Sequence, residues 1–205
     1  MEICKTCGAV LFHTEIDLED IIGQEHAKRA LEVALAGHHT IAFFGNREAE
    51  VLAEIATRLG VTVWAVQTCP CGYRDFGPQR ECICNLSQVA RWQKRKVYQN
   101  ARNADIVVEC PPAYAYQIDA WVSGRRSELE TIILSRVKNR GKLPLIHLDT
   151  TGRSLLKIAA TQLNMNIYRV KTILRVAQTI AALGHSDQIG VVHLAEAIQY
   201  RPRNY

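Results

Sequence analysis

The stretch that decides the fold is TIAFFGNREAEVLAEIATRLGVTVWAV, residues 40–66. Residues 40–45 are apolar and end in glycine, which is typical of a short buried strand, and the β-branched and aromatic run at 61–66 predicts a second strand. The residues between them repeat apolar side chains with a helical period, at Leu52, Ile55, Ala56 and Leu59. A strand, a helix and a strand in this order predict an α/β core.

The flanking sequence extends this pattern in both directions. Residues 24–36 predict a helix, 104–110 predict a third strand, and further helices are predicted at 87–101 and 127–141. The last third of the chain is expected to be all helical. We therefore expect a short N-terminal segment with a CxxC motif at 1–16, an α/β core at 17–145 and a helical lid at 146–205.

Composition favours a soluble protein of ordinary kind. The chain has 205 residues, of which 48% are hydrophobic, and its formal net charge is +5. The longest apolar runs are too short to cross a bilayer, and the N-terminal sequence does not fit a signal peptide, so we expect a cytoplasmic location. That compartment keeps thiols reduced, and clustered cysteines there hold metal more often than they form disulfides.

Four of the seven cysteines stand within CPCGYRDFGPQRECIC, residues 69–84. Cys69, Cys71, Cys82 and Cys84 supply four thiolates, which is the ligand set of a closed structural zinc site. Gly72, Gly77 and Pro78 supply turns that bring the two pairs together. We expect structural Zn²⁺ at these four residues, and the alternative is a hairpin of reduced buried thiols without metal.

A second cysteine pair, Cys4 and Cys7, resembles one knuckle of a zinc ribbon. His13 is a candidate third ligand, and a bridge across a dimer would complete the set in another way. The surroundings do not fit the strand–helix junction of a thioredoxin-like redox motif, and no second pair is visible, so we expect an unoccupied or opportunistic site there.

Three motifs together resemble the magnesium-chelatase-like AAA+ ATPases, in particular the competence-protein ComM type. They are DLEDIIGQEHAKRALEVALAGHHTIAFFG, CPCGY…CICNLSQVARW and ILRVAQTIAALGHSDQIGVVHLAEAIQYRP, and they occur in family order over most of residues 17–203. The resemblance implies a reduced AAA+ core with a short parallel sheet of about three strands, flanked by helices and followed by the family's helical lid.

The departures from the family motif concern ATP. The family's phosphate loop, GPPGSGKT, directs backbone N–H groups and a lysine at the phosphates. Here Gly45 remains, but the lysine position falls on Val51 and the hydroxyl position on Leu52. Glu48 and Glu50 would oppose a triphosphate, and no hydroxyl is left for magnesium. The stretch that carries the acidic metal-binding strand in the family is also missing.

We therefore expect a pseudo-ATPase that acts as a zinc-containing binding or regulatory module for nucleic acid or a partner AAA+ protein. The alternative is an AAA+ ATPase subunit that binds nucleotide through an unconventional loop. Four residues stand at positions where the family binds nucleotide, and they would be the remnant of such a site. The alternative is that these residues are kept only for helix packing. They are Ile22, Gly23, Gly45 and Arg169. His38 and His39 are expected to be exposed turn residues.

Two candidate interaction surfaces follow. A basic run with interleaved aromatic residues could meet phosphate backbones, although such runs are often only solvated helix faces; its members are Arg91, Lys94, Arg95, Lys96 and Arg102. The family's strand order, 5-1-4-3-2, would leave strand 61–66 as an apolar sheet edge here, because strands 2 and 3 are missing. Such an edge invites self-association or a protein partner, unless a local loop covers it.

Overall fold

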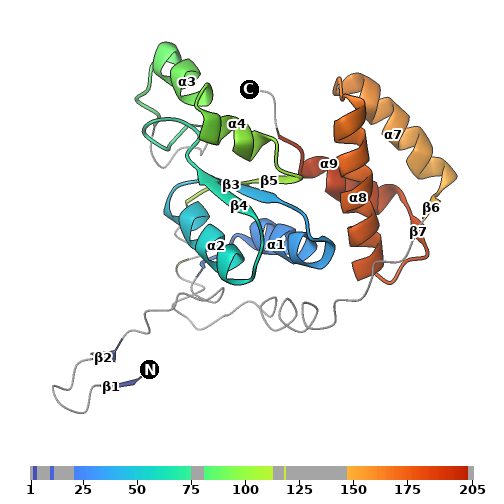
Figure 1. Ribbon diagram of the computed structural model, residues 1–205, viewed down its shortest axis with the longest axis horizontal. Coiled ribbons are helices and arrows are strands. Elements are labelled where there is room, and N and C mark those ends of the chain that lie inside the picture. The colour runs from blue at the N-terminus through green and yellow to red at the C-terminus, as the bar shows by residue number, and fades with distance from the viewer. Residues whose placement is uncertain are drawn as a thin grey trace.

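The protein is described from a computed structural model (Figure 1). The structure describes residues 21–74, 81–112, 118 and 147–202, together with the backbone of two short strands. Those strands, β1 (Glu2–Ile3) and β2 (Val10–Leu11), pair antiparallel near the N-terminus. Cys4, Cys7 and the predicted helix 127–141 lie outside the described residues.

A three-stranded parallel sheet forms the centre of the molecule, as predicted. Its strands are β3 (Ile41–Gly45), β4 (Val63–Val66) and β5 (Ile106–Cys110), in the order β4-β3-β5. Ile41 of β3 stands opposite Val63 on one side and Ile106 on the other. The first, second and third predicted strands are therefore adjacent with the first in the middle, which confirms the expected α/β class and strand order.

Helices cover both faces of this sheet because side chains of β3 alternate between them. Helices α1 (Glu25–Gly37) and α2 (Arg47–Arg58) pack on the face that carries Ile41 and Phe43. Helix α4 (Lys96–Arg102) covers the opposite face, where Phe44 meets Tyr98 edge-to-face with ring centroids 5.3 Å apart. Every residue of β3 is buried, as expected for a central strand with two covered faces.

The predicted single helix at 87–101 is wrong in one respect. It consists of α3 (Leu86–Gln93) and α4, separated by a break at Lys94 and Arg95. Arg95 has extended backbone angles and begins α4 as its N-cap residue. The break lets Trp92 and Tyr98 pack together against the same face of the sheet, which one straight helix would not allow.

The C-terminal part consists of three helices, as predicted, with one addition. They are α7 (Thr150–Gln162), α8 (Ile167–Leu183) and α9 (Val191–Gln199). Two short strands, β6 (His147–Leu148) and β7 (Gln188–Ile189), pair in parallel and tie the start of α7 to the start of α9, so this part is not all helical. Helix α8 packs against α1, and one continuous hydrophobic cluster joins the lid to the sheet.

Among the residues that the structure describes, no helix combines the length and apolarity needed to cross a membrane.

Candidate functional site

The four cysteines of the 69–84 stretch come together beyond the carboxyl end of β4. Their sulfur atoms all lie within 4.8 Å of one another. The Cys69 and Cys71 sulfurs are 3.3 Å apart, and the Cys82 sulfur lies 3.7 Å from the first and 3.6 Å from the second. A tetrahedral zinc ion with Zn–S bonds of about 2.3 Å needs S–S separations of about 3.8 Å. The donor set therefore fits a four-coordinate metal ion.

Local sequence explains how the two pairs meet. After Cys69, the Gly72 N–H donates to the Cys69 carbonyl at 3.0 Å, and Gly72 has φ +81°, a conformation that glycine adopts without strain. The Thr68 hydroxyl closes the same turn by donating to the Arg74 carbonyl at 2.9 Å. On the other side, Asn85 follows Cys84 directly and caps α3 in a reciprocal capping box with Gln88.

The thiols of this cluster perturb one another. Burial pushes the pKa of Cys71 upward, but hydrogen bonds from the Tyr73 backbone and the Cys69 thiol outweigh it and lower the pKa to about 6. Burial and the neighbouring sulfurs raise the pKa of Cys84 to about 12. Four sulfurs at this distance cannot all ionise without a positive charge between them, and a divalent cation bound by all four would supply it.

The position of the family's phosphate loop has a different structure here. Strand β3 ends at Gly45 and α2 begins at Arg47, so a single residue, Asn46, connects them. Gly45 stands opposite Cys110 in the ladder, and a Cβ atom at Gly45 would collide with the Cys110 carbonyl. This glycine is therefore explained by close strand packing, and no multi-residue loop is present to surround a phosphate group.

The cysteine turn closes over this junction. Gly72 lies against the Asn46 side chain so closely that a Cβ atom at Gly72 would overlap its amide oxygen. Val51, which stands at the lysine position of the family's phosphate loop, lies within α2 and is half-buried. Leu52 is fully buried in the core. Glu48 and Glu50 occupy the first turn of α2, where Glu50 pairs with Arg47 at 3.2 Å.

Three of the four residues of the predicted nucleotide remnant, Ile22, Gly23 and Gly45, lie near the carboxyl end of β5, and the fourth does not. Ile22 and Gly23 precede α1 beside the end of β5, where the adjacent Gln24 side chain donates to the Pro111 carbonyl. Arg169 lies at the opposite end of the sheet, because its guanidinium donates to the carbonyls of Ala104 at 3.1 Å and Arg102 at 3.2 Å, just before β5. Its contacts are those of a residue that holds the lid to the core.

The expectation that His39 is exposed is wrong, whereas His38 is exposed as predicted. His39 is 3% exposed, and its Nε2–H donates to the Thr179 hydroxyl of α8 at 2.8 Å. The hydroxyl in turn donates to the Arg175 carbonyl at 3.2 Å. Thr179 interrupts the buried apolar stripe of its helix, so the sequence indicates a buried hydroxyl that needs a hydrogen-bond partner, but it does not identify His39 as that partner.

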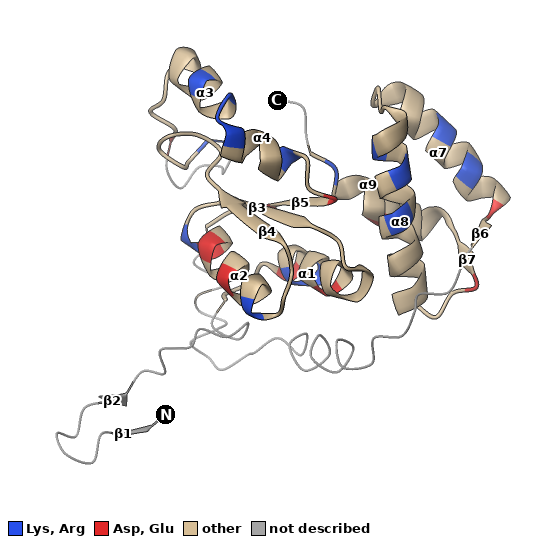
Figure 2. Cartoon of the chain, in the orientation of Figure 1, with Lys and Arg blue, Asp and Glu red and all other residues tan. Residues whose placement is uncertain are grey.

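The predicted basic residues gather on α3, α4 and the break between them (Figure 2). Arg91, Lys94, Arg95 and Lys96 are exposed, and Arg102 is half-buried. The Arg95 guanidinium stacks over the Trp92 ring at 4.0 Å, and the Trp92 indole N–H donates to the Gln67 carbonyl at 2.9 Å. We call the surface made by these five basic residues the α3–α4 surface. It adjoins the cysteine cluster, because α3 begins two residues after Cys84.

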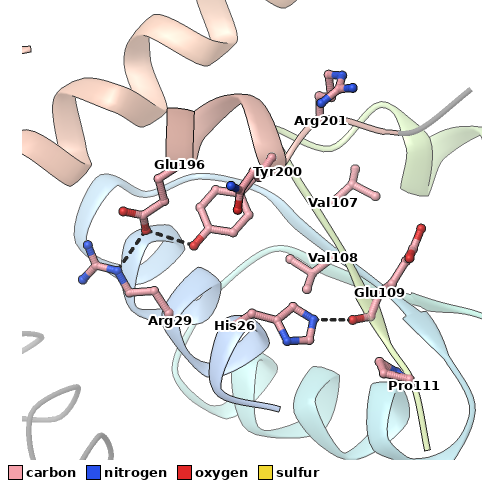
Figure 3. A pocket seen from close by; sticks show the side chains of 10 residues that line it. His26, Arg29, Val107, Val108, Glu109, Pro111, Glu196, Tyr200 and Arg201 are labelled. Atoms are coloured by element: carbon pink, nitrogen blue, oxygen red, sulfur yellow. Dashed lines mark hydrogen bonds and ion pairs between the residues drawn. The ribbon is translucent and has the colours of Figure 1, made fainter. Parts of the chain in front are cut away.

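A pocket of about 420 Å³ lies along the outer side of β5, between α1 and α9 (Figure 3). Its polar groups largely satisfy one another. The Arg29 guanidinium pairs with Glu196 at 3.0 Å, the Tyr200 hydroxyl donates to the same carboxylate at 3.0 Å, and a His26 ring N–H donates to the Glu109 carbonyl at 2.6 Å. Burial and Glu196 raise the pKa of Tyr200. These contacts tie α9 to α1 and β5.

Comparison with known proteins identifies two similar segments, one in each half of the chain. The family model for magnesium chelatase, subunit ChlI, matches residues 17–59, and the model for the C-terminal part of that subunit matches residues 125–201. Together these matches cover more than half of the chain. The competence protein ComM of Haemophilus influenzae is 63% identical over 30 residues, which are 15% of this chain and 6% of that protein's length.

Proposed function

Because this chain belongs to the magnesium-chelatase-like family, in a shortened ComM-type form, we propose that it is a binding module that does not hydrolyse ATP. The observation that carries this proposal is the direct junction of β3 and α2, with the Cys69–Gly72 turn packed on Asn46. A triphosphate bound at this helix N-terminus would have to displace that turn. It would also meet the carboxylates of Glu48 and Glu50, and it would find Val51 where the family has a lysine.

The metal in the cysteine cluster, in this proposal, is Zn²⁺ with a structural function. Four thiolates in a tetrahedron suit zinc, and a site with four protein ligands leaves no open position for a substrate. The core on this side of the sheet is small, with Val66, Tyr98 and Trp92 among its members. Bound zinc would hold the turn at Gly72 and the start of α3 in place, and so support the α3–α4 surface.

The partner proposed for the α3–α4 surface is the phosphate backbone of a nucleic acid. Four exposed cations within six residues attract phosphate, and Arg95 over Trp92 is held in a defined position. Acidic side chains concentrate elsewhere, on α2 (Figure 2). This separation of charge gives an acidic ligand a preferred face.

The absence of ATP chemistry is tested by titrating Mg²⁺·ATP into the purified protein and measuring heat and phosphate release. We expect neither binding up to millimolar ATP nor turnover. A micromolar dissociation constant with phosphate release would overturn the proposal and favour the alternative of an unconventional ATPase.

Nucleic-acid binding is tested by fluorescence anisotropy with single- and double-stranded DNA at several salt concentrations. The double variant R91E/K94E should weaken binding at least tenfold and reduce the salt dependence, because it removes two phosphate contacts. The double variant R153E/K157E, at two exposed positions of α7, changes the net charge by the same amount, so it is the matched control and should have little effect. Equal losses in both variants would show that only net charge matters and would contradict a specific surface.

A further inference from the structure

The outer edge of β4 is open. Within the parallel ladder, the Ile41 N–H donates to the Thr62 carbonyl, so the backbone groups of Thr62, Trp64 and Val66 point towards β3. Those of Val63 and Ala65 therefore point away from the sheet. In the part of the chain that the structure describes, no hydrogen bond reaches these outward groups, and Ala65 is exposed.

At the opposite edge of the sheet, the outward backbone groups of β5 form hydrogen bonds with the rest of the chain. There the Val107 N–H of β5 donates to the Tyr200 carbonyl at 2.8 Å, and His26 binds the Glu109 carbonyl. Proteins protect exposed sheet edges with proline, inward charges or bulges. The strand sequence Val63–Val66, VWAV, contains none of these devices and pairs with β3 without a bulge. An apolar edge of this kind, with unpaired backbone groups, can accept a partner strand.

We propose that two copies of the chain pair through β4, antiparallel across a twofold axis, to make a continuous six-stranded sheet. Backbone groups at both ends of the strand already form hydrogen bonds within the chain, and this determines the register of the pairing. The Val61 N–H donates to the Ala56 carbonyl, and the Gln67 carbonyl accepts from Trp92. The hydrogen bonds between the two copies must therefore use residues 63 and 65. Val63 of each copy then pairs with Ala65 of the other through four hydrogen bonds in all, and Trp64 lies on the axis.

Helix α2, which flanks β4 on one face of the sheet, fits this arrangement. Helix α2 packs against both β3 and β4 on one face of the sheet. With a strand spacing of about 4.8 Å, the two α2 helices would lie about 10 Å apart, which is the usual distance between packed helices. On the other face, the two half-buried Trp64 side chains become a directly opposed aromatic pair, which adds to sheet stability.

The first test measures association by sedimentation equilibrium from low micromolar to about 200 µM, a range that covers weak to moderate dimers. We expect a monomer–dimer equilibrium for the wild type. Ala65→Pro removes an outward N–H that the rest of the protein does not use, so it should weaken the dimer at least tenfold. Ala65→Ser keeps the N–H and is the matched control. Metal content and thermal unfolding, unchanged in both variants, would show that the monomer is intact.

The second test examines the register. Trp64→Cys places two thiols opposite each other at a non-hydrogen-bonded pair, where Cα atoms are about 4.5 Å apart and a disulfide can form. Mild oxidation should give a dimer that resists denaturant and is reversed by reductant. Val63→Cys faces Ala65 instead, so it should cross-link no more than wild type.

A wild-type monomer at 200 µM, or dimerisation that survives Ala65→Pro, would overturn this inference. So would cross-linking at residue 63 in preference to 64. None of these results depends on ATP or nucleic acid, so they test the pairing independently of the proposed function.

Discussion

Acid should detach the lid from the core through His39. The ring lies at the boundary between α1 and α8, with its Nε2–H bound to Thr179 and its Nδ1 buried without a hydrogen-bond partner among the described residues. Protonation at Nδ1 would place a charged N–H where no acceptor is available. Burial therefore lowers the pKa of His39 from 6.5 to about 4, even though Asp105 opposes the shift; Arg175 and His38 add to it.

This pKa shift predicts the sign and size of a pH effect. The unfolded chain takes up a proton near pH 6.5 and the folded chain only near pH 4, so the unfolded state binds more protons between these values. Stability is then complete above pH 6.5 and falls as the pH falls towards 4. At 1.36 kcal/mol per pKa unit, the loss between pH 7 and pH 4 is about 3 kcal/mol from this one group.

The assay is urea unfolding, followed by circular dichroism, at half-unit steps from pH 7.5 to pH 4. His39→Gln keeps an amide N–H for Thr179 but cannot titrate, so it should remove most of the 3 kcal/mol from the pH profile. His38→Gln, the exposed neighbour, is the control and should leave the profile unchanged. If His39→Gln loses stability with pH as steeply as the wild type, His39 is not the group that responds, and the reasoning from burial fails.

Three further changes probe other contacts. Cys82→Ser should abolish bound metal, measured by elemental analysis after purification without chelator, whereas Cys110→Ser, at a buried thiol outside the cluster, should retain it. Arg169→Ala removes two hydrogen bonds to the core and should lower the free energy of unfolding by about 1–3 kcal/mol, whereas the exposed Lys171→Ala should change it by less than about 0.5 kcal/mol. Phe43→Ala, at the fully buried centre of β3, should cost about 3–5 kcal/mol in urea unfolding, and Ile158→Ala, at a side chain that is 55% exposed, should cost much less.

The sheet and its neighbours could be predicted because their signals are local. An unbroken apolar run such as 41–45 fits a central strand covered on both faces, and the period of α2 follows from Leu52, Ile55 and Ala56. The cysteine cluster could be predicted equally well, because turn-forming residues between the two cysteine pairs bring the four thiols together. In each case the residues that make the structure are close together in the sequence.

The contacts that the sequence did not give are long-range. His39 and Thr179 are 140 residues apart, and nothing near His39 distinguishes a buried ring from an exposed one. The contacts of Arg169 are equally difficult to predict, because its partners are backbone carbonyl oxygens, which every residue carries. The break at Lys94 and Arg95 was missed for another reason. Both residues favour helices, and it is the packing of Trp92 and Tyr98 on one face that overrides this preference.

Two separate features oppose a nucleotide at the end of β3, and they have different physical origins. The packing of Gly72 on Asn46 is steric and depends on the cysteine turn, so loss of metal could relieve it. The charges of Glu48 and Glu50 and the burial of Leu52 belong to α2 itself and would remain. Opening the turn would therefore expose a helix N-terminus without a lysine or a magnesium-binding hydroxyl. Because the second obstacle does not depend on the first, we expect that metal release alone would not allow ATP to bind, and under the proposed function any regulation through the cysteine cluster would act on the ligand of the α3–α4 surface.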